Sequence, residues 1–433
     1  MNYWDKKGVI MTPQIKQRLD QIQRGEVPEG YKRTKAGVVP IEWEETRLAR
    51  YLVVNSDKNI SLQYGKDDVF SISGELGIVN QIELLGRSYA GVSVEPYGIV
   101  YPDNVVYTKS PLKANPYGII KTNKTGKTGI VSTLYAIFRC NDNVCPDFVQ
   151  SYFELDQNLN NYLYPIVNIG AKHDMKISDE NSLKGWVVFP PLDEQKKIAE
   201  ILSAQDKLIA LKEKLIEEKK RQKKYLMQQL LTGKKRLPRF SGKWTDVKLG
   251  DVFKERVETN CQDLELLSVT GTNGVVPRSS IESKDNSSED KSKYLKICKG
   301  DIGYNTMRMW QGVSALSEYE GIVSPAYTIL IPNQRISAKY FSYLFKMHAV
   351  IFLFYRFSQG IVDDTRSLKY YEFAKLHLTV PADKEEQEAI AEIICTADRE
   401  IAILQKEIDQ EKQKKKALMQ LLLTGIVRVN YNE

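Results

Sequence analysis

One short run in the second half of the chain carries the side chains that most often read bases in duplex DNA. Residues 305–312 read Asn-Thr-Met-Arg-Met-Trp-Gln-Gly and follow a strand-like start at Asp301–Tyr304. In the major groove an arginine can pair with guanine and a glutamine with adenine. A second loop, Ser358–Gly360 with a nearby arginine, has the same character. The DNA-binding candidates of this half are Arg308, Trp310, Gln311, Gln359 and Arg366.

The first half of the chain offers a parallel set of basic side chains in turn-like segments. Such side chains contact phosphates and base edges in protein–DNA complexes. For each of these residues, as for those of the second half, an ordinary solvated loop position is the alternative interpretation. The candidates are Lys109, Lys121, Lys124, Lys127, Lys172 and His173.

The motifs of enzymes that act on DNA are missing. The only Pro-Pro pair, Pro190-Pro191, precedes leucine, so the Asn/Asp-Pro-Pro-aromatic motif of amino-methyltransferases is absent. Residues 126–128 resemble the end of a phosphate-binding loop, but Lys121 stands where that loop requires glycine. Asp363-Asp364 fits a solvated turn better than a nuclease site. We therefore expect no catalytic residue in this chain.

Cysteine and histidine usage argues against a metal site. The five cysteines are scattered, and the three histidines are far apart, so no set has zinc-ligand spacing. Few, unpaired cysteines favour a reducing compartment. Residues 1–30 have no apolar signal segment, and Tyr340–Phe357 contains charged residues and reads as a buried helix. These features predict a cytoplasmic protein without a bound metal.

An internal repeat organises the positions of the candidate residues. Residues 194–233 align with residues 386–425 at a constant offset of 192, with 21 of 40 positions identical. Each copy follows a proline, Pro191 or Pro381, and ends at a glycine, Gly233 or Gly425. Proline before and glycine after the repeat predict one long helix for each copy.

Apolar residues in both copies recur at alternating steps of four and three, the heptad pattern of a coiled coil. A helix of 40 residues is about 60 Å long and cannot bury such a stripe alone. We expect the two copies to pair with each other. The predicted pairing or docking residues are Ile198, Leu202, Ile209, Ile216, Leu226, Leu230, Ile390, Ile394, Ile401, Ile408, Leu418 and Leu422.

The chain order fixes the direction of this pairing. The first helix leads from one globular segment to the next, and the second helix starts there and must return, so the helices are antiparallel. Two similar lobes then occupy opposite ends of a rod, related by a pseudo-two-fold axis. Two-fold proteins read paired half-sites on DNA in this way. Because the lobes differ in sequence, their half-sites should differ too.

The segments between the helices predict lobes of mixed α/β class. Short strand-like runs such as Val105–Tyr107 and Tyr327–Ile331 alternate with turns, and helix-like stretches such as Asp147–Leu155 follow. The net charge of +7 is compatible with DNA but does not require it. The segment Lys212–Arg239 alone carries +8, and a solvated coiled coil explains its lysines as well as DNA does.

The repeated segments resemble a known family. The run PPLDEQKKIAEIL at Pro190–Leu202, the run MQQLLTG at Met227–Gly233 and their second copies resemble the conserved helices of type I restriction-modification specificity subunits. The lobe openings around Trp43 and Trp244 resemble the starts of that family's target recognition domains. The resemblance extends from about Gly30 to the end of the second helix. One departure is the start of the second helix, where residues 381–387 read PADKEEQ. This stretch is two residues longer than Pro191–Gln195, the corresponding stretch from proline to glutamine in the first copy.

The resemblance implies a non-catalytic subunit that binds double-stranded DNA. Each lobe would read one half of a bipartite, asymmetric site, and the helices would set the spacer and dock two methyltransferase (M) subunits. The M subunits bind S-adenosylmethionine and methylate adenine, and an ATP-dependent restriction (R) subunit joins for cleavage. S-adenosylmethionine, ATP and Mg²⁺ thus belong to the partners, with none bound by this chain.

The corresponding domain division has five segments. They are an N-terminal arm at 1–29, target recognition domain 1 at 30–190, a central helix at 191–236, target recognition domain 2 at 237–381 and a C-terminal helix at 382–433. We call the two recognition domains lobe 1 and lobe 2. The alternative is a coiled-coil scaffold, or another two-lobed DNA-binding protein without a role in restriction-modification.

Overall fold

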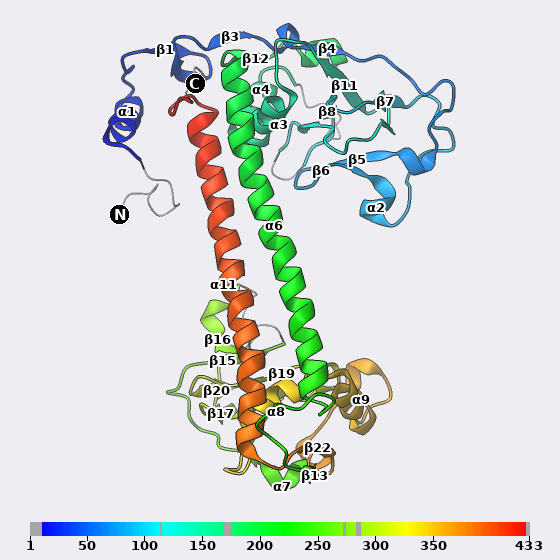
Figure 1. Ribbon diagram of the computed structural model, residues 1–433, viewed down its shortest axis with the longest axis vertical. Helices are drawn as coiled ribbons and strands as arrows, with labels where there is room; N and C mark the ends of the chain where they lie inside the picture. The colour runs from blue at the N-terminus through cyan, green and yellow to red at the C-terminus, as the bar shows by residue number, and fades with distance from the viewer. Residues whose placement is uncertain are drawn as a thin grey trace. The chain divides into compact units, whose positions relative to one another are not determined.

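The computed structural model of the protein describes residues 11–112, 115–167, 175, 177–271, 274–282 and 287–429. The chain forms two compact units. Unit 1 comprises Met1–Glu213 with Lys406–Glu433, and unit 2 comprises Lys214–Gln405. Lobe 1 belongs to unit 1 and lobe 2 to unit 2. The order of their helices and strands can be followed in Figure 1.

Lobe 1 is built on a four-stranded antiparallel sheet in the order β4-β11-β8-β9. Two smaller two-stranded sheets, β5-β6 and β7-β10, accompany it, and β3 pairs with β12, so the beginning and end of the lobe meet. The strands are β3 (Glu44–Arg47), β4 (Leu52–Val54), β5 (Phe70–Ser73), β6 (Gly77–Asn80), β7 (Gly98–Val100), β8 (Val105–Thr108), β9 (Ile119–Thr122), β10 (Gly129–Val131), β11 (Tyr135–Cys140) and β12 (Trp186–Phe189).

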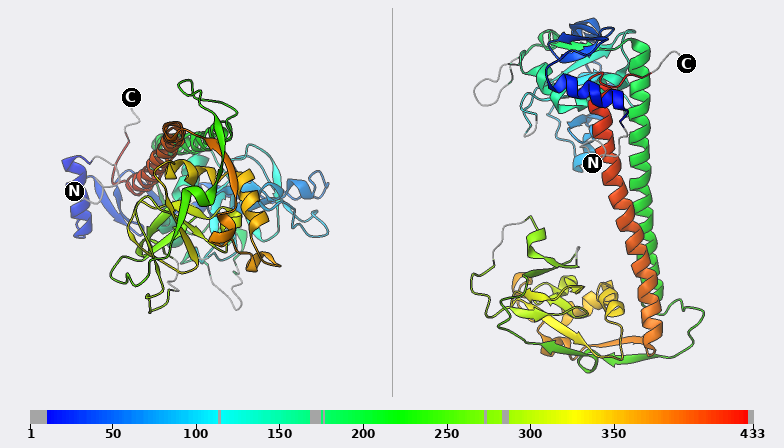
Figure 2. Two further views of the ribbon diagram at one scale, coloured as in Figure 1. Left: turned by 90° about the horizontal axis from the view of Figure 1, so that it is seen from below. Right: turned by 90° about the vertical axis from the view of Figure 1, so that its left-hand side faces the viewer.

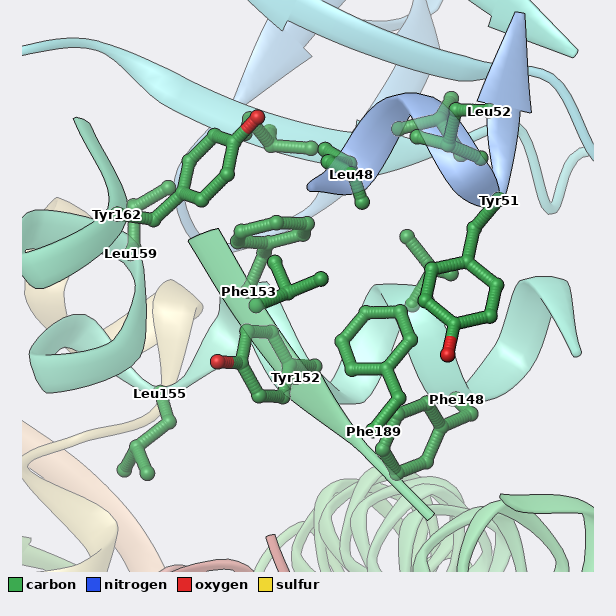
Figure 3. Packing of buried hydrophobic residues seen from close by; sticks show 14 of the residues in the cluster. Leu48, Tyr51, Leu52, Phe148, Tyr152, Phe153, Leu155, Leu159, Tyr162 and Phe189 are labelled. Carbon is green, nitrogen blue, oxygen red and sulfur yellow. The ribbon is translucent and has the colours of Figure 1, made fainter. Parts of the chain in front are cut away.

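Aromatic side chains pack α3 of lobe 1 (Pro146–Glu154) against β12. Figure 3 shows Phe148 and Tyr152 packed around Phe189 of β12. The ring of Phe148 lies edge-on to Phe189 at 5.1 Å, and that of Tyr152 lies 4.9 Å away, which are favourable aromatic geometries. The helices of this lobe are α2 (Gln81–Leu85), α3 (Pro146–Glu154), α4 (Asp156–Leu163) and α5 (Asp179–Ser182).

Lobe 2 repeats the strand plan of lobe 1. Its four-stranded sheet has the order β14-β21-β18-β19, with β15-β16 and β17-β20 as the small sheets, and β13 pairs with β22. The strands are β13 (Trp244–Lys248), β14 (Phe253–Arg256), β15 (Leu267–Thr270), β16 (Gly274–Pro277), β17 (Leu295–Ile297), β18 (Ile302–Asn305), β19 (Ser314–Leu316), β20 (Gly321–Val323), β21 (Tyr327–Pro332) and β22 (His377–Pro381). The helices are α7 (Leu249–Val252), α8 (Ala338–Leu344), α9 (His348–Phe357) and α10 (Tyr370–Phe373).

Two long helices of equal length each contribute a segment to both units. They are α6 (Leu192–Leu230) and α11 (Lys384–Leu422). Ammonium groups of Lys212, Lys219 and Lys223 lie 3.1, 2.7 and 2.5 Å from carboxylates of Glu407, Glu400 and Asp398. Because the partner's number falls as the number in α6 rises, the helices are antiparallel, side by side in each view of Figures 1 and 2. The predicted mixed α/β lobes and antiparallel helix pair are confirmed.

The apolar stripes of these helices are buried in part by the lobe cores, which the heptad pattern alone does not predict. The stripe residues at the helix ends enter the lobe cores: Ile198 and Leu202 pack in lobe 1, and Ile390 and Ile394 in lobe 2. Met419 and Leu422 of α11 join the core of lobe 1, and Leu230 of α6 joins the core of lobe 2. Each lobe core therefore contains side chains from both helices. The predicted stripe residues that are buried are Ile198, Leu202, Ile209, Ile216, Leu230, Ile390, Ile394, Ile408 and Leu422, whereas Leu226, Ile401 and Leu418 are partly buried.

The glutamine of the repeated Glu-Gln pair fixes each helix start to its lobe. Gln195 donates to the Pro190 carbonyl at 2.9 Å and accepts from the Cys145 backbone N–H at 2.9 Å. Gln387 donates to the Pro381 carbonyl at 2.8 Å and accepts from the Ser337 N–H at 2.9 Å. Both helices therefore start with the same hydrogen bonds, although their sequences differ in length here.

A short helix from the N-terminal arm packs against the end of α11. Helix α1 (Pro13–Gln23) is capped by the Thr12 side chain, which accepts from the Ile15 N–H at 3.4 Å. Its Leu19 forms a small apolar cluster with Met11 and Leu421. The hairpin β1 (Tyr31–Thr34) and β2 (Gly37–Pro40) follows, and Tyr31 donates to the Gly425 carbonyl at 2.9 Å.

Candidate nucleic-acid interface

The loop between β18 and β19 is shaped by its own sequence. The Asn305 side chain accepts from the Met307 N–H at 3.0 Å, and buried Met309 anchors the 3-10 turn η6 (Met309–Gln311). Gly312 ends the turn at φ +79°, a left-handed conformation that favours glycine. Trp310 donates from its indole to the Met307 carbonyl at 2.9 Å. Trp310 is thereby held in place, and Gln311 is exposed to solvent.

The structure joins this loop to the second candidate loop through Tyr355 at the end of α9. The ring of Trp310 stands edge-on to Tyr355 at 6.1 Å. The guanidinium of Arg366 lies 4.1 Å from the Tyr355 ring centre and donates to its hydroxyl at 3.2 Å. Arg366 also pairs with Asp363 at 3.3 Å. Two candidates that lie 56 positions apart in sequence thus meet on one tyrosine.

Gln359 lies beside this cluster, with its side chain already engaged. Its backbone exchanges hydrogen bonds with Ser367, which closes the loop between them. The side-chain amide donates to Glu372 at 3.2 Å, and its oxygen accepts from the Tyr371 hydroxyl at 2.9 Å. Gln359 is exposed but oriented by two partners, as a residue that must present a defined hydrogen-bonding edge would be.

Apolar side chains surround these polar groups in solvent. Phe352 is 53% exposed and stacks on Tyr355, and Ile361 is 97% exposed. Exposed apolar clusters of this kind mark binding surfaces in soluble proteins. We call this surface the aromatic face. It comprises Met307, Trp310, Gln311, Phe352, Tyr355, Gln359, Ile361, Val362, Arg366 and Tyr371. Arg308, half-buried, starts η6 at its edge.

Sequence reasoning missed Phe352, Tyr355 and Tyr371, which hold the face together. Phe352 and Tyr355 lie in Tyr340–Phe357, which the sequence predicts to be a buried helix, and Tyr371 lies in the short helix α10. The available signal was the composition of α9, His-Ala-Val-Ile-Phe-Leu-Phe-Tyr-Arg-Phe, which is mostly apolar. Phe352, Tyr355 and Phe357 of this helix are exposed, and exposed large apolar side chains that cluster indicate a binding surface.

The basic candidates of lobe 1 are dispersed. Lys109 pairs with Asp179 at 2.6 Å, and Lys124 pairs with both Asp103 and Asp147 at 2.6 Å. Lys121 is buried, and that burial lowers the pKa of its ammonium. Lys127 is exposed, but it follows β9 and so lies at the opposite end of the β8–β9 pair from Lys109. Lys172 and His173 lie outside the described residues.

Lobe 1 nevertheless has an aromatic pair where lobe 2 has Trp310 and Tyr355. Tyr117, in the loop between β8 and β9, meets Tyr164, which follows α4, edge-on at 5.8 Å. Tyr164 is 70% exposed. In both lobes an aromatic pair therefore links the loop after the second strand of the four-stranded sheet, counted along the chain, to the end of the second helix that follows the sheet.

The side chains on these surfaces are of types that can bind nucleic acid. An exposed aromatic ring packs against bases or sugars, an arginine presents a fork of donors, and an oriented glutamine presents a donor and an acceptor. Within the described residues, no three His, Cys, Asp or Glu side chains gather in a way that could hold a metal ion. No described helix combines the length and apolar character that spanning a membrane requires.

The chain thus has two lobes of one strand topology and two long antiparallel helices. Residues 241–413 match the family model described as "Type I restriction modification DNA specificity domain". The resemblance drawn from the repeated helices is therefore confirmed.

Individual relatives agree with this family match. The specificity subunit of type I restriction enzyme MjaVIII from Methanocaldococcus jannaschii is 27% identical over 270 residues, which are 56% of this chain and 62% of that protein. A solved structure described as "Structural basis underlying complex assembly and conformational transition of the type I R-M system" has a TM-score of 0.53 at 14% identity, covering 90% of this chain and 99% of its own. The type I S subunit from M. genitalium has a TM-score of 0.50 at 13% identity, covering 90% and 96%. These structures share the fold.

Proposed function

We propose that the chain is the DNA specificity subunit of a type I restriction-modification complex, and that each lobe reads one half of a bipartite, asymmetric site. The observation that carries this proposal is the pair of equivalent aromatic contacts, Tyr117–Tyr164 and Trp310–Tyr355. The same place in two copies of one fold carries a different aromatic residue, Tyr117 in lobe 1 and Trp310 in lobe 2, each partly exposed. Equivalent positions with different side chains are what two different half-sites require.

The helices would set the spacer between the half-sites. Support comes from the hydrogen bonds of Gln195 and Gln387, which fix each lobe to a helix start. Further support comes from polar groups at stripe positions. Gln205 is buried and donates to the Glu411 carboxylate at 2.8 Å, and Lys212 pairs with Glu411 at 3.2 Å. Polar residues inside a helix pair specify its register.

The helices would also dock two M subunits, and an R subunit would join the complex for cleavage. Support comes from apolar side chains that the lobes leave exposed on them. In unit 1, Leu208 and Leu211 of α6 are exposed, and in unit 2, Leu215 of α6 with Ile393 and Ile403 of α11 are exposed. S-adenosylmethionine, ATP and Mg²⁺ would act in the partner subunits, and this chain would contribute recognition without catalysis.

The test is a map of methylated adenines in cells that express the M subunit with and without this chain. We expect a bipartite methylated motif only in the presence of the chain. Trp310→Ala should alter one half of that motif and leave the other half and the spacer intact, and Arg308→Ala should weaken one half-site by ~1–3 kcal/mol if it reads a base. Tyr319→Ala is the matched control, because Tyr319 is an exposed aromatic at the other end of β19. An unchanged methylation map upon assembly of the complex would reject the proposal.

A further inference from the structure

Unit 2 contains a cavity of about 1030 Å³ between its two helix segments and lobe 2. It opens against β19, α8 and the start of α9, and its size is that of a pocket for a small molecule, for which roughly 300–1,000 Å³ is typical. Met227, Tyr343 and Ile401 contribute an apolar wall. The ionisable side chains along it are Lys220, Lys223, Lys224, Lys339, Lys346, His348, Glu318, Cys395 and Asp398.

Among the residues that the structure describes, two of these lysines have no acidic partner. Lys223 pairs with Asp398 at 2.5 Å, Lys339 with Glu392 at 3.1 Å and Lys220 with Glu217 at 2.8 Å. Within the described part of the chain, no carboxylate pairs with Lys224 or with Lys346. The Lys346 ammonium donates to the Gly312 carbonyl at 2.7 Å, and burial together with Lys223 lowers its pKa to about 8.

Lobe 1 has a carboxylate at the corresponding place. Lys415, which corresponds to Lys223 at the offset of 192, pairs with Asp206 at 2.8 Å, as Lys223 pairs with Asp398. Lys415 also pairs with Glu154 at 3.1 Å. The offset of 192 also holds in the lobes, because it relates β11 to β21 and the start of α3 to the start of α8. The residue 192 positions after Glu154 is Lys346. The repeat thus replaces a carboxylate by a second ammonium, a difference of two charges at one site.

The two lobes also differ near this position in the edge strand of the four-stranded sheet, which is β9 in lobe 1 and β19 in lobe 2. Ile137 and Ile329 correspond in the repeat, and they pair with Val106 of β8 and Gly303 of β18. Val106 pairs in turn with Lys121 of the edge strand β9, and Gly303 pairs with Ala315 of the edge strand β19. Lys121 is buried, with Glu154 and Lys415 among the charges that act on it. Lobe 1 thus has a long buried lysine near a carboxylate, where lobe 2 has alanine beside a cavity.

We propose that the cavity of unit 2 binds the phosphate group of a small molecule of up to nucleotide size. The phosphate takes the place of the Glu154 carboxylate and is held by Lys346 and Lys224. The remainder of the ligand lies in the space along Ala315 and against the apolar wall. Phosphates in a DNA duplex are the other source of this chemistry, but they lie on the outside of a wide cylinder, whereas Lys346 is partly buried inside a cavity.

The test is calorimetric titration of the full chain at pH 7, without magnesium, using pyrophosphate, ADP and a duplex DNA of unrelated sequence as separate ligands. We expect ADP and pyrophosphate to bind wild type. Lys346→Glu should weaken both by at least tenfold, because it restores the carboxylate of lobe 1, and it should leave duplex binding unchanged. Lys254→Glu, the same charge change on an exposed residue of lobe 2 outside the cavity, should bind ADP like wild type.

Thermal unfolding separates a lost site from a lost fold. Lys346→Glu should unfold at the same temperature as wild type or higher, since a carboxylate then faces Lys223. If it fails to fold, Lys346→Met removes the ammonium without adding a charge and should show the same loss of binding. The proposal is overturned if neither ADP nor pyrophosphate binds wild type, or if Lys346→Glu binds them equally well. It is also overturned if the variant weakens duplex DNA instead, which would make Lys346 a contact to the DNA backbone.

Discussion

Arg428 and Glu194 form a two-point ion pair that ties the end of α11 to the start of α6. The Nε and Nη2 atoms of Arg428 donate to the two carboxylate oxygens of Glu194 at 2.7 and 2.9 Å. Glu194 is fully buried and also accepts from the indole of Trp43 at 3.2 Å. The first acidic residue of the repeat therefore anchors the helix start, the helix end and the lobe opening in one place.

Unit 2 contains an equivalent ion pair, formed by the residues that correspond to Arg428 and Glu194 at the offset of 192. Arg236 follows α6 and donates to Glu386, near the start of α11, at 2.8 Å from both Nε and Nη2. The lobe opening differs, since the indole nitrogen of Trp244 is buried without a hydrogen-bond partner among the described residues. Arg236 lies over the Trp244 ring at 5.8 Å instead.

Arg236→Ala should destabilise unit 2 by about 3 kcal/mol, because it leaves the carboxylate of Glu386 buried and unpaired. This value is at the low end for a buried ion pair, since a third of the Arg236 side chain is exposed. Chemical denaturation of the full chain measures the change. Arg239→Ala, which removes an exposed arginine three positions later, should shift the midpoint by less than about 0.5 kcal/mol. Equal effects of both substitutions would show that the ion pair adds no stability.

The sequence predicts the helices and the fold class well because both depend on periodicity. The repeat and the glycines at its ends place the two helices to within a few residues. What periodicity does not predict is the partner that buries a stripe. The heptad positions of Ile198 and Ile394 are compatible both with a contact between the two helices and with burial in a lobe core. Only the folded chain shows that Ile198 packs in the core of lobe 1 and Ile394 in the core of lobe 2.

The candidate site is predicted in part, for a related reason. Residue type alone selects Trp310 and Arg366, but it does not reveal that they meet on Tyr355, because that contact depends on how α9 lies against the β18–β19 loop. In lobe 1, Lys109 looks like a free phosphate contact in the sequence. Its ion pair with Asp179, 70 positions away, appears only in the folded chain.

Gly425→Ala should destabilise unit 1 by about 2–4 kcal/mol. Gly425 ends α11 at φ +72°, where an L-residue is strained, and an added Cβ would lie 2.4 Å from the ring of Pro40. The rigid proline ring cannot move aside as a flexible side chain would. The control is Gly242→Ala, because Gly242 has open space around it and no positive φ. Thermal unfolding should separate the two variants clearly, and a Gly425→Ala protein as stable as wild type would contradict the packing described here.

Leu211→Glu should weaken assembly with M subunits if those subunits dock on the helices. Leu211 is 66% exposed on α6, so a charge there costs little in the chain alone but disrupts an apolar contact with a partner. Co-purification from cells that express both proteins, followed by mass measurement of the complex, is the assay. Leu76→Glu is the matched control, since Leu76 is 62% exposed in the β5–β6 turn of lobe 1. Assembly that is unaffected by Leu211→Glu would remove this part of α6 from the docking surface.

The ammonium of Lys346 should make the stability of unit 2 depend on pH in the alkaline range. Burial and the nearby charge of Lys223 lower its pKa from 10.5 to about 8 in the folded chain. Between about pH 8 and pH 10.5, the unfolded chain therefore binds more protons at this residue than the folded chain, and stability rises with pH across that window. Below pH 8 both states are protonated, and the cost of the buried charge is constant.

The dependence is isolated by comparison with Lys346→Met, which removes the titrating group and keeps the length of the side chain. The difference in unfolding free energy between Lys346→Met and wild type should be largest near pH 7 and should shrink as pH approaches 10.5. Other groups that titrate in this range, such as tyrosines, affect both proteins alike and cancel in the difference. A difference that stays constant from pH 7 to pH 10.5 would mean that Lys346 keeps its ordinary pKa, and therefore that the cavity does not disfavour its charge.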